Sequence, residues 1–344
     1  MVKLSITYFI WATALATLTA AASLYNLPAS LPTSFNWTSS GILISPKSDS
    51  YEIAGVKDPS VIYHEGRYHV FASTAKLAGY SLVYLNFTDF AHASSTNFTY
   101  LDTTSIGTGY RAAPQVFYFT PTKTWYLVYQ NGNAAYSTNS DINNPNGWSS
   151  PKTFYPDMPT IIADNIADGY WVDMWVICDS RNCHLFSSDD NGHLYRSDTT
   201  LSNFPSGFSE PVIAMQDPDK YRVYEASNVY KVNNIYLLIV EAIGTDGRRY
   251  FRSWTSSTIT GTWHPLADSE SHPFARANNV DFNDTTWTQD ISHGEMVRTI
   301  VDQTMTIHPC NMHYLYQGMD PSAGGEYNGL PWRIGLLKQT NSSC

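Results

Sequence analysis

Three carboxylic acid residues stand at or near the start of apolar segments that are far apart in the chain. Asp58 lies in "KDPSVIY", Asp173 in "WVDMWVICD" and Glu225 in "YEASNVY". Carboxyl groups that converge repel one another, so their pKa values separate and one stays ionised while another holds a proton near neutral pH. Such a set can activate water and protonate a departing oxygen, which is what cleavage of a glycosidic bond requires. A single aspartate at a strand start more commonly serves a turn, so this chemistry depends on the three residues meeting.

An internal repeat predicts that they do meet. Units begin near Asp58, Ala113, Asp173, Glu225 and His293, between 52 and 68 residues apart, and each joins a polar or small residue to an apolar strand, a turn and an aromatic-rich strand. Repeating antiparallel units of this size predict an all-β, five-bladed β-propeller. A β-sandwich is the alternative, because it also has short strands with regular turns. The innermost strand of each blade lines the axis, so the three carboxylates, at equivalent repeat positions, should face one funnel.

The N-terminal stretch has the pattern of a secretory signal peptide over residues 1–22. Lys3 precedes an apolar run from Ile6 to Leu18, and small residues follow around Ala20 to Ala22. The run is too short to span a bilayer, and no later run approaches spanning length. We therefore expect one secreted propeller domain over residues 23–344, with no membrane partner. The sequons that could carry glycans begin at Asn36, Asn86, Asn97, Asn283 and Asn341.

Composition argues against a nucleic-acid partner. The chain of 344 residues has a net charge of −10 and only 15% charged residues, so a phosphate backbone would be repelled. It has 24 tyrosines and 10 tryptophans. These aromatic residues suit packing between sheets, and they also suit stacking on sugar rings. We expect a monomer.

Four cysteines remain after the signal segment: Cys178, Cys183, Cys310 and Cys344. In an oxidising compartment they should pair, and three connectivities are possible. Cys178 and Cys183 bracket "DSRN" between two apolar segments, which places them across a hairpin. This favours the pairs Cys178–Cys183 and Cys310–Cys344, and the spacing does not suit a zinc site.

Several motifs resemble those of a known family when they are taken in order. They are "KDPSVIY", "WVDMWVICD", "YEASNVY", "LLIVEAIGTDGRRYFRSW", "DISHGEMVR", "DQTMTIHPCN" and "YNGLPWRIGLL", and they run from about Phe35 to the C-terminus. The set resembles glycoside hydrolase family sixty-two, secreted α-L-arabinofuranosidases that act on arabinoxylan. Related five-bladed arabinanases and xylosidases of family forty-three share the three-carboxylate plan, but not "DISHG" or "LPWR" in this form.

The resemblance implies a role for each matching residue. It implies that Asp58 is the general base, that Asp173 modulates pKa values and orients the substrate, and that Glu225 is the general acid. Lys57 would contact the arabinose. Tyr327 and Arg333, in "EYNGLPWR", would border the sugar subsites, although packing of the last blade is the other interpretation of both residues.

Two further positions follow from the same resemblance. His293 takes the axial position of the fifth repeat, where a histidine of the family lies beneath the sugar and helps to hold a hydrated calcium. Calcium is therefore the expected ion, although a satisfied core or turn histidine is the commoner role, and one imidazole is an unusual calcium ligand. Asn131, in "QNG", stands where the family commonly has a tryptophan that borders the substrate, so substrate preference should differ here.

The expected function is that of an inverting, exo-acting hydrolase that releases L-arabinofuranose from arabinoxylan and arabinoxylo-oligosaccharides. Two alternatives remain at this stage. One is an arabinanase or β-xylosidase of the same propeller plan. The other is a non-catalytic propeller that binds carbohydrate, against which the three intact carboxylates argue.

Overall fold

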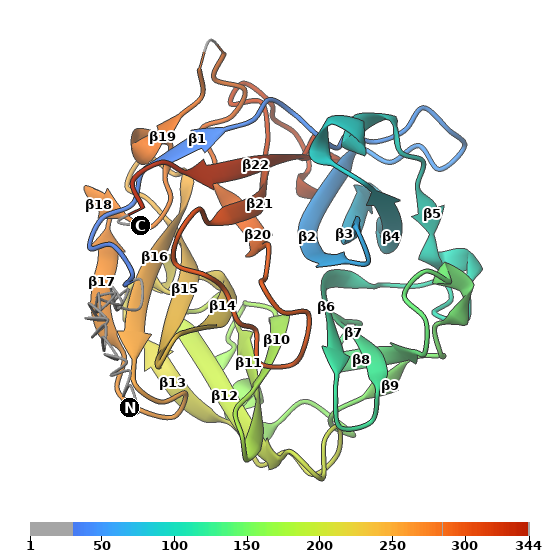
Figure 1. The fold of residues 1–344 in the computed structure, drawn as a ribbon, viewed down its shortest axis with the longest axis vertical. Helices are drawn as coiled ribbons and strands as arrows, with labels where there is room; N and C mark the ends of the chain where they lie inside the picture. Colours follow the sequence, from blue (N-terminus) through green and yellow to red (C-terminus); the bar gives the residue numbers. More distant parts are fainter. Residues whose placement is uncertain (1–29, 284, 343–344) are drawn as a thin grey trace, which may run out of the picture.

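Five β-sheets surround a central axis (Figure 1), as the repeats predict. The computed structural model describes residues 30–342 except residue 284. The predicted signal peptide, residues 1–22, lies outside this part of the chain. Within the described part, no helix is long and apolar enough to cross a membrane. The all-β, five-bladed prediction is confirmed and the β-sandwich is excluded.

The first four blades are consecutive in the chain, and each runs outward from the axis. Blade one is β2 (Gly55–His64), β3 (Arg67–Lys76), β4 (Gly79–Phe87) and β5 (Thr99–Tyr100). Blade two is β6 (Ala112–Phe119), β7 (Thr124–Gln130), β8 (Ala134–Asn139) and β9 (Lys152–Thr153). Blade three is β10 (Val172–Cys178), β11 (Asn182–Ser188), β12 (His193–Thr200) and β13 (Val212–Gln216). Blade four is β14 (Glu225–Val232), β15 (Ile235–Ile243), β16 (Arg249–Ser256), β17 (His264–Ser269) and β18 (His272–Pro273). A short helix, α1 (Thr160–Asn165), connects blades two and three.

The fifth blade combines both ends of the described chain. Its inner strands are β20 (Ser292–Met296), β21 (His313–Gly318) and β22 (Arg333–Gln339). Next to β22 lies β1 (Trp37–Ser39), antiparallel to β22, and beyond it β19 (Val280–Asp281), parallel to β1 (Figure 1). Hydrogen bonds between the first strand and the last therefore close the ring.

The apolar inner strands form the wall of the axis. The inner strand β2 is buried over its first eight residues, and β10 is buried throughout, because neighbouring blades cover both faces of each sheet. Strands buried on both faces are apolar almost continuously. The outermost strands β5 and β9 have two residues each, and edges this short offer little surface for pairing with another chain.

A disulfide joins Cys178 at the end of β10 to Cys183 in β11, with an S–S distance of 2.06 Å. It closes the tight turn of the third blade, so this predicted pair is confirmed. The second predicted pair, Cys310–Cys344, includes a residue outside the described part of the chain. That pair stays a prediction.

Each inner strand contains a β-bulge close to its first residue. The register shifts between Lys57 and Ser60 in β2, and corresponding shifts occur in β6, β10, β14 and β20. One bulge residue in each of the first four blades has a positive φ: Asp58 (49°), Ala113 (50°), Asp173 (59°) and Ala226 (51°). Positive φ is uncommon for residues other than glycine and persists only where the surroundings hold it, often at functional sites.

The bulges correct one expectation from the sequence. Glu225 does not occupy the position of Asp58 and Asp173. It pairs with Glu241 as Lys57 pairs with Ser73, and Ala226 is the residue with the left-handed backbone. Matching carboxylates to carboxylates in the sequence conceals this offset of one residue, because the bulge is a property of the backbone.

Candidate active site

A ring of hydrogen bonds holds the five bulges around the axis. Each bulge presents a buried backbone N–H, and a side chain of the preceding blade accepts its hydrogen bond, as buried backbone donors require. In four of the five cases, the acceptor lies on the second strand of that preceding blade. There it pairs with the inner-strand residue just before the bulge. The four bonds are Asp58 N to Gln317 Oε1 (2.7 Å), Ala113 N to Ser73 Oγ (2.8 Å), Asp173 N to Gln130 Oε1 (2.8 Å) and His293 N to Glu241 Oε2 (2.7 Å).

The fifth bond differs, and it concerns a predicted catalytic residue. Ser188 holds the equivalent place in blade three, but its buried Oγ has no hydrogen-bond partner among the described residues. Instead, Asp173 Oδ2 accepts from Ala226 N at 2.7 Å. The carboxylate of Asp173 is thus tied to the residue that follows Glu225, and this bond fixes the position of both.

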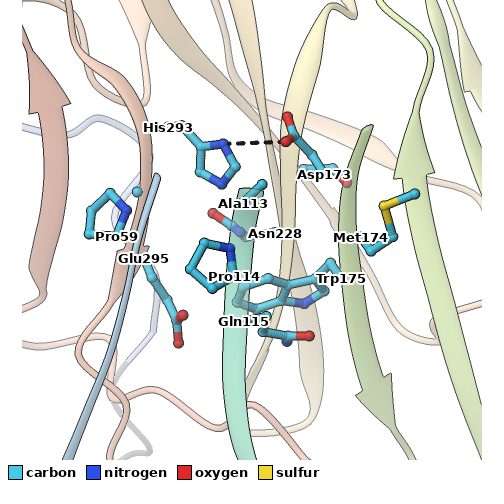
Figure 2. A pocket seen from close by; sticks show the side chains of 12 residues that line it. Pro59, Ala113, Pro114, Gln115, Asp173, Met174, Trp175, Asn228, His293 and Glu295 are labelled. Carbon is cyan, nitrogen blue, oxygen red and sulfur yellow. Dashed lines mark ion pairs between the residues drawn. The ribbon is translucent and has the colours of Figure 1, made fainter. Parts of the chain in front are cut away.

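His293 joins two of the predicted catalytic carboxylates. Its Nδ1 lies 3.5 Å from Asp58 Oδ1 and 3.6 Å from Asp173 Oδ1. Figure 2 shows the imidazole ring and the Asp173 carboxylate facing each other, and both residues line a small cavity. The structure therefore brings together residues from blades one, three and five, as the repeat positions predict.

The charges around Asp58 and Asp173 push their pKa values apart. Burial would raise the pKa of Asp58, but the Lys57 ammonium, the His293 imidazole and a hydrogen bond from Ser73 lower it further than burial raises it. Burial raises the pKa of Asp173 to about 7, with repulsion from Glu225 and Asp58 adding to it and His293 opposing it. One carboxylate is thus ionised at neutral pH while the other is poised to titrate, the arrangement expected of an acid–base site.

Glu225 lies in an ionic network with Arg249 and Glu241. The Arg249 Nη1 donates to Glu225 Oε1 and also to Glu241 Oε1. Glu241 uses its other oxygen to accept from Ser292 Oγ (2.9 Å) and His293 N (2.7 Å). Burial lowers the pKa of Arg249, but both carboxylates raise it well above its usual range. The predicted acid is therefore held at a fixed place on the channel mouth by a permanently charged partner.

Lys57 is buried among aromatic rings beside Asp58. Its Nζ donates to the hydroxyl of Tyr327 at 3.0 Å, and it lies 4.6 to 5.6 Å from the ring centroids of Tyr327, Tyr80 and Trp332. Tyr327 is 44% exposed, so this predicted substrate-binding residue stands at the open rim. The group presents a cation and ring faces together, a combination that suits a hydroxyl-rich ligand.

The other two predicted substrate-binding residues make local contacts. Arg333 Nη1 donates to the carbonyls of Ala54 (2.9 Å) and Trp332 (2.8 Å), which joins β22 to the segment before β2. Asn131 Oδ1 accepts from Asn133 N at 3.2 Å in the turn after β7. Neither contact reaches the carboxylates, so a substrate role for these two residues stays a prediction.

The calcium expectation at His293 is wrong. Within residues 30–342 without 284, no group of three or more histidine, cysteine, aspartate or glutamate side chains is arranged to hold a metal ion. The cavity below the ring has a volume of only about 10 Å³, close to the least space that one water molecule needs, whereas calcium takes six to eight oxygen ligands. The His293 ring instead has two carboxylates as partners. Burial lowers its pKa, but Asp173 and Asp58 raise it above its usual value.

Sequence reasoning missed several residues of this site: Gln130, Asp190, Glu241, Arg249 and Tyr110. Gln130 and Glu241 lie near the ends of the second strands of blades two and four, where each pairs with the first residue of its inner strand. This repeated position could have been read from the alternation of the strands. Arg249 lies inside the quoted motif "GRRYFRSW". Tyr110 accepts from Gln130 Nε2 and is 41% exposed, with its ring centroid 5.9 Å from that of Tyr80. It supplies an aromatic ring next to the turn that carries Asn131.

Comparison with known proteins agrees with this geometry. The sequence profile of glycosyl hydrolase family 62 matches residues 36–338. Alpha-L-arabinofuranosidase C of Cellvibrio japonicus (strain Ueda107) is 43% identical over 308 residues, which cover 88% of this chain and 46% of that protein. The chain therefore spans about half the length of this relative.

Solved structures give the same answer. The catalytic domain of the Coprinopsis cinerea GH62 alpha-L-arabinofuranosidase is 69% identical with a TM-score of 0.91, over 91% of this chain and 100% of that one. A GH62 hydrolase in complex with xylotriose is 58% identical with a TM-score of 0.88, over 89% and 98%. A thermostable family-43 glycoside hydrolase, 13% identical with a TM-score of 0.55 over 86% and 92%, shares the fold alone.

Proposed function

This chain belongs to glycosyl hydrolase family 62, and we propose that it is an α-L-arabinofuranosidase that removes L-arabinofuranosyl side chains from arabinoxylan and arabinoxylo-oligosaccharides. The observation that carries this proposal is the convergence of Asp58 and Asp173 on His293, beside a Glu225 held by Arg249. Two of its relatives are alpha-L-arabinofuranosidases and a third binds xylotriose, and both facts support this substrate.

In the proposed mechanism, Asp58 activates the attacking water molecule. Its low pKa keeps it ionised, so it can take a proton from a water molecule that attacks the anomeric carbon. Glu225 gives a proton to the glycosidic oxygen as the bond to xylose breaks. Asp173 acts on both steps, since it shares His293 with Asp58 and accepts from the N–H of Ala226. Attack by a water from the face opposite the leaving group inverts the anomeric configuration.

Secretion and a monomeric state are part of the proposal. The apolar segment at residues 1–22 supports secretion, and the disulfide Cys178–Cys183 suits an oxidising compartment. Three of the sequon asparagines, Asn36, Asn97 and Asn283, are exposed and could accept glycans. Size-exclusion chromatography with light scattering measures the oligomeric state.

The decisive experiment compares two polysaccharides. The protein is incubated with wheat arabinoxylan and with debranched arabinan, and the products are separated. Arabinose from arabinoxylan alone supports the proposal. Arabino-oligosaccharides from arabinan would identify an arabinanase, and xylose would identify a xylosidase. The absence of any product would indicate a propeller that binds carbohydrate without cleaving it.

Stereochemistry is tested on the same reaction. Proton NMR of the first-formed arabinose should show the β-anomer from the α-linked substrate. An initial α-anomer would mean retention and would make Asp58 a nucleophile.

A further inference from the structure

A fourth carboxyl group lies against the predicted acid. Asp190, in the turn between β11 and β12, places its carboxyl group within hydrogen-bonding reach of the Glu225 carboxyl group in the next blade. Its Oδ1 is buried and has no hydrogen-bond partner among the described residues. Burying a carboxyl oxygen without a hydrogen-bond partner costs much free energy when the group is ionised. The cost is smaller when the carboxyl group holds a proton.

The turn that presents Asp190 is built tightly around its neighbour Asp189. The buried Asp189 carboxylate accepts four hydrogen bonds. The donors are Asn191 N (2.9 Å), His193 N (3.2 Å), His193 Nδ1 (2.7 Å) and Tyr195 OH (2.8 Å). These bonds fix both sides of Asp190, so its side chain is placed by the turn and does not simply fall toward Glu225.

Two glycines allow the turn to pack this closely. A Cβ at Gly169 would lie 1.9 Å from the carbonyl oxygen of Asp189, and a Cβ at Gly192 would lie 2.5 Å from that of Asp217. Asp190 itself has a φ of 55°, a left-handed conformation that aspartate tolerates better than most residues. The backbone thus accepts some strain to bring this carboxyl group to the site.

Charged groups from five elements face Glu225, and the cations among them oppose its role as acid. Burial raises the pKa of Glu225, but Arg249 and Lys57 lower it below its usual range. A general acid must hold a proton at the start of the reaction. The groups that act on Glu225 are Arg249 (β16), Lys57 (β2), His293 (β20), Glu241 (β15) and Asp173 (β10), with Tyr224 beside it. Glu225 is therefore ionised in the resting site and needs a nearby source for the proton that it gives.

Asp190 can supply the proton that Glu225 needs. We infer that Asp190 is a positioning residue that keeps one proton on the Asp190–Glu225 carboxyl pair, so that Glu225 can protonate the leaving xylose oxygen. Two carboxyl groups in direct contact titrate as a unit, and one proton stays with the pair until the pH is well above that of a single carboxyl group. In support, burial and then repulsion from Glu225 and Asp173 raise the pKa of Asp190 to about 10.

The proton balance of the step is simple. In the resting pair the proton lies on Asp190 and Glu225 is ionised beside Arg249. The proton moves along the hydrogen bond to Glu225, and from there to the glycosidic oxygen as its bond to the anomeric carbon breaks. Asp58 meanwhile takes one proton from the attacking water. Solvent then removes the proton from Asp58 and returns one to the pair.

This inference rests on the proposed function, and Asp190→Asn tests it. The amide has nearly the shape of the carboxyl group, so the turn should remain, but the pair can no longer share a proton. Arg249 and Lys57 then hold Glu225 ionised. We expect the alkaline limb of kcat/KM on arabinoxylan to move at least one pH unit lower, so that turnover at a pH on that limb falls about tenfold or more. An aryl arabinofuranoside with a good leaving group needs less protonation and should lose much less.

Two variants control for structure. Asp217→Asn removes a carboxylate near the same turn that pairs with Arg222 instead, at 3.2 Å, and should keep the wild-type pH profile. Asp190→Glu retains a carboxyl group and should restore the alkaline limb at least in part. An Asp190→Asn profile equal to wild type refutes the inference. Equal losses on both substrates also refute it, because they indicate a disturbed site and not a missing proton.

An infrared difference spectrum tests the proton without turnover. At neutral pH, wild type minus Asp190→Asn should show the loss of one protonated carboxyl band. Loss of one carboxylate band instead would mean that both groups are ionised, and would overturn the inference. Failure of the proposed function gives a different result, since wild type would then release no arabinose while this spectrum still reports on the pair.

Discussion

Gln130 offers a direct test of whether the ring of hydrogen bonds positions the catalytic groups. The side chain is 5% exposed, its Oε1 accepts from Asp173 N at 2.8 Å, and its Nε2 donates to Tyr110 OH. Gln130→Ala leaves the Asp173 N–H buried and unsatisfied, in a bulge whose φ is 59°. Loss of the partner of a buried donor costs about 1–3 kcal/mol.

The size of the expected effect follows from the length of the chain. At about 2.1 cal/mol/K per residue of unfolding entropy, the melting temperature should fall by about 2–5 °C. Activity should fall more sharply, because a displacement of about 1 Å in a catalytic group can reduce the rate by about 100-fold. We therefore expect kcat for arabinose release to drop about 10- to 100-fold, with a smaller change in KM.

A matched glutamine separates position from stability. Gln303 is also buried, and its Oε1 accepts from Thr120 N at 3.0 Å, away from the carboxylates. Melting temperatures and kcat on an aryl arabinofuranoside are measured for Gln130→Ala and Gln303→Ala. Similar losses of stability with equal kcat values in the two variants would refute the reasoning. Gln130→Glu should recover stability, since it restores an acceptor, but its charge beside Asp173 should raise the pKa of that residue further.

Three more predictions follow from the charges and the disulfide. Lys57→Met removes the strongest charge that lowers the pKa of Asp58, so the acidic limb of kcat/KM should move to higher pH; an unmoved limb would exclude this lysine as the cause. The raised pKa of His293 stabilises the fold fully below its ordinary value of about 6.5 and less as the pH rises through the folded value. Urea titrations of His293→Gln should therefore show the largest destabilisation near pH 5.5 and the smallest near pH 9, and the reverse trend would contradict an imidazolium. Replacing Cys178 and Cys183 with serine should lower the free energy of unfolding by about 2 kcal/mol, because the loop is short, and a loss twice as large would show that the bridge does more than constrain the unfolded chain.

The fold could be predicted from the sequence because the blades repeat. The inner and second strands are long, apolar and separated by recognisable turns, so their number and order follow from periodicity. The closing strand is different. The strand β1 is three residues, "WTS", and nothing in so short a segment indicates that it pairs with β22 at the other end of the chain. Its place depends on the free edge of β22, which exists only after the other strands of blade five have paired.

The candidate site could be predicted in part for a related reason. The sequence indicates Asp58, Asp173 and His293 because a repeat position is also an axial position. Glu225 lies one residue before the position that the repeat predicts, since its longer side chain starts from the strand pair before the bulge. The sequence does not single out Asp190, because an aspartate in a turn between two strands is usually explained by turn formation. Its contact with Glu225 comes from the packing of two neighbouring blades.

The hydrogen bonds between blades explain why this site depends on the whole ring. Asp58 N relies on Gln317 from blade five, and Asp173 N relies on Gln130 from blade two. Blade five is itself completed by β1 next to β22. The base is thus held by a blade whose sheet includes the first strand of the described chain, while the acid is held by Arg249 within its own blade and by Asp190 from the blade before it. Since the acceptors are of different types, Ser73, Gln130, Asp173, Glu241 and Gln317, each junction can give its catalytic group a different charge environment while the backbone geometry stays the same.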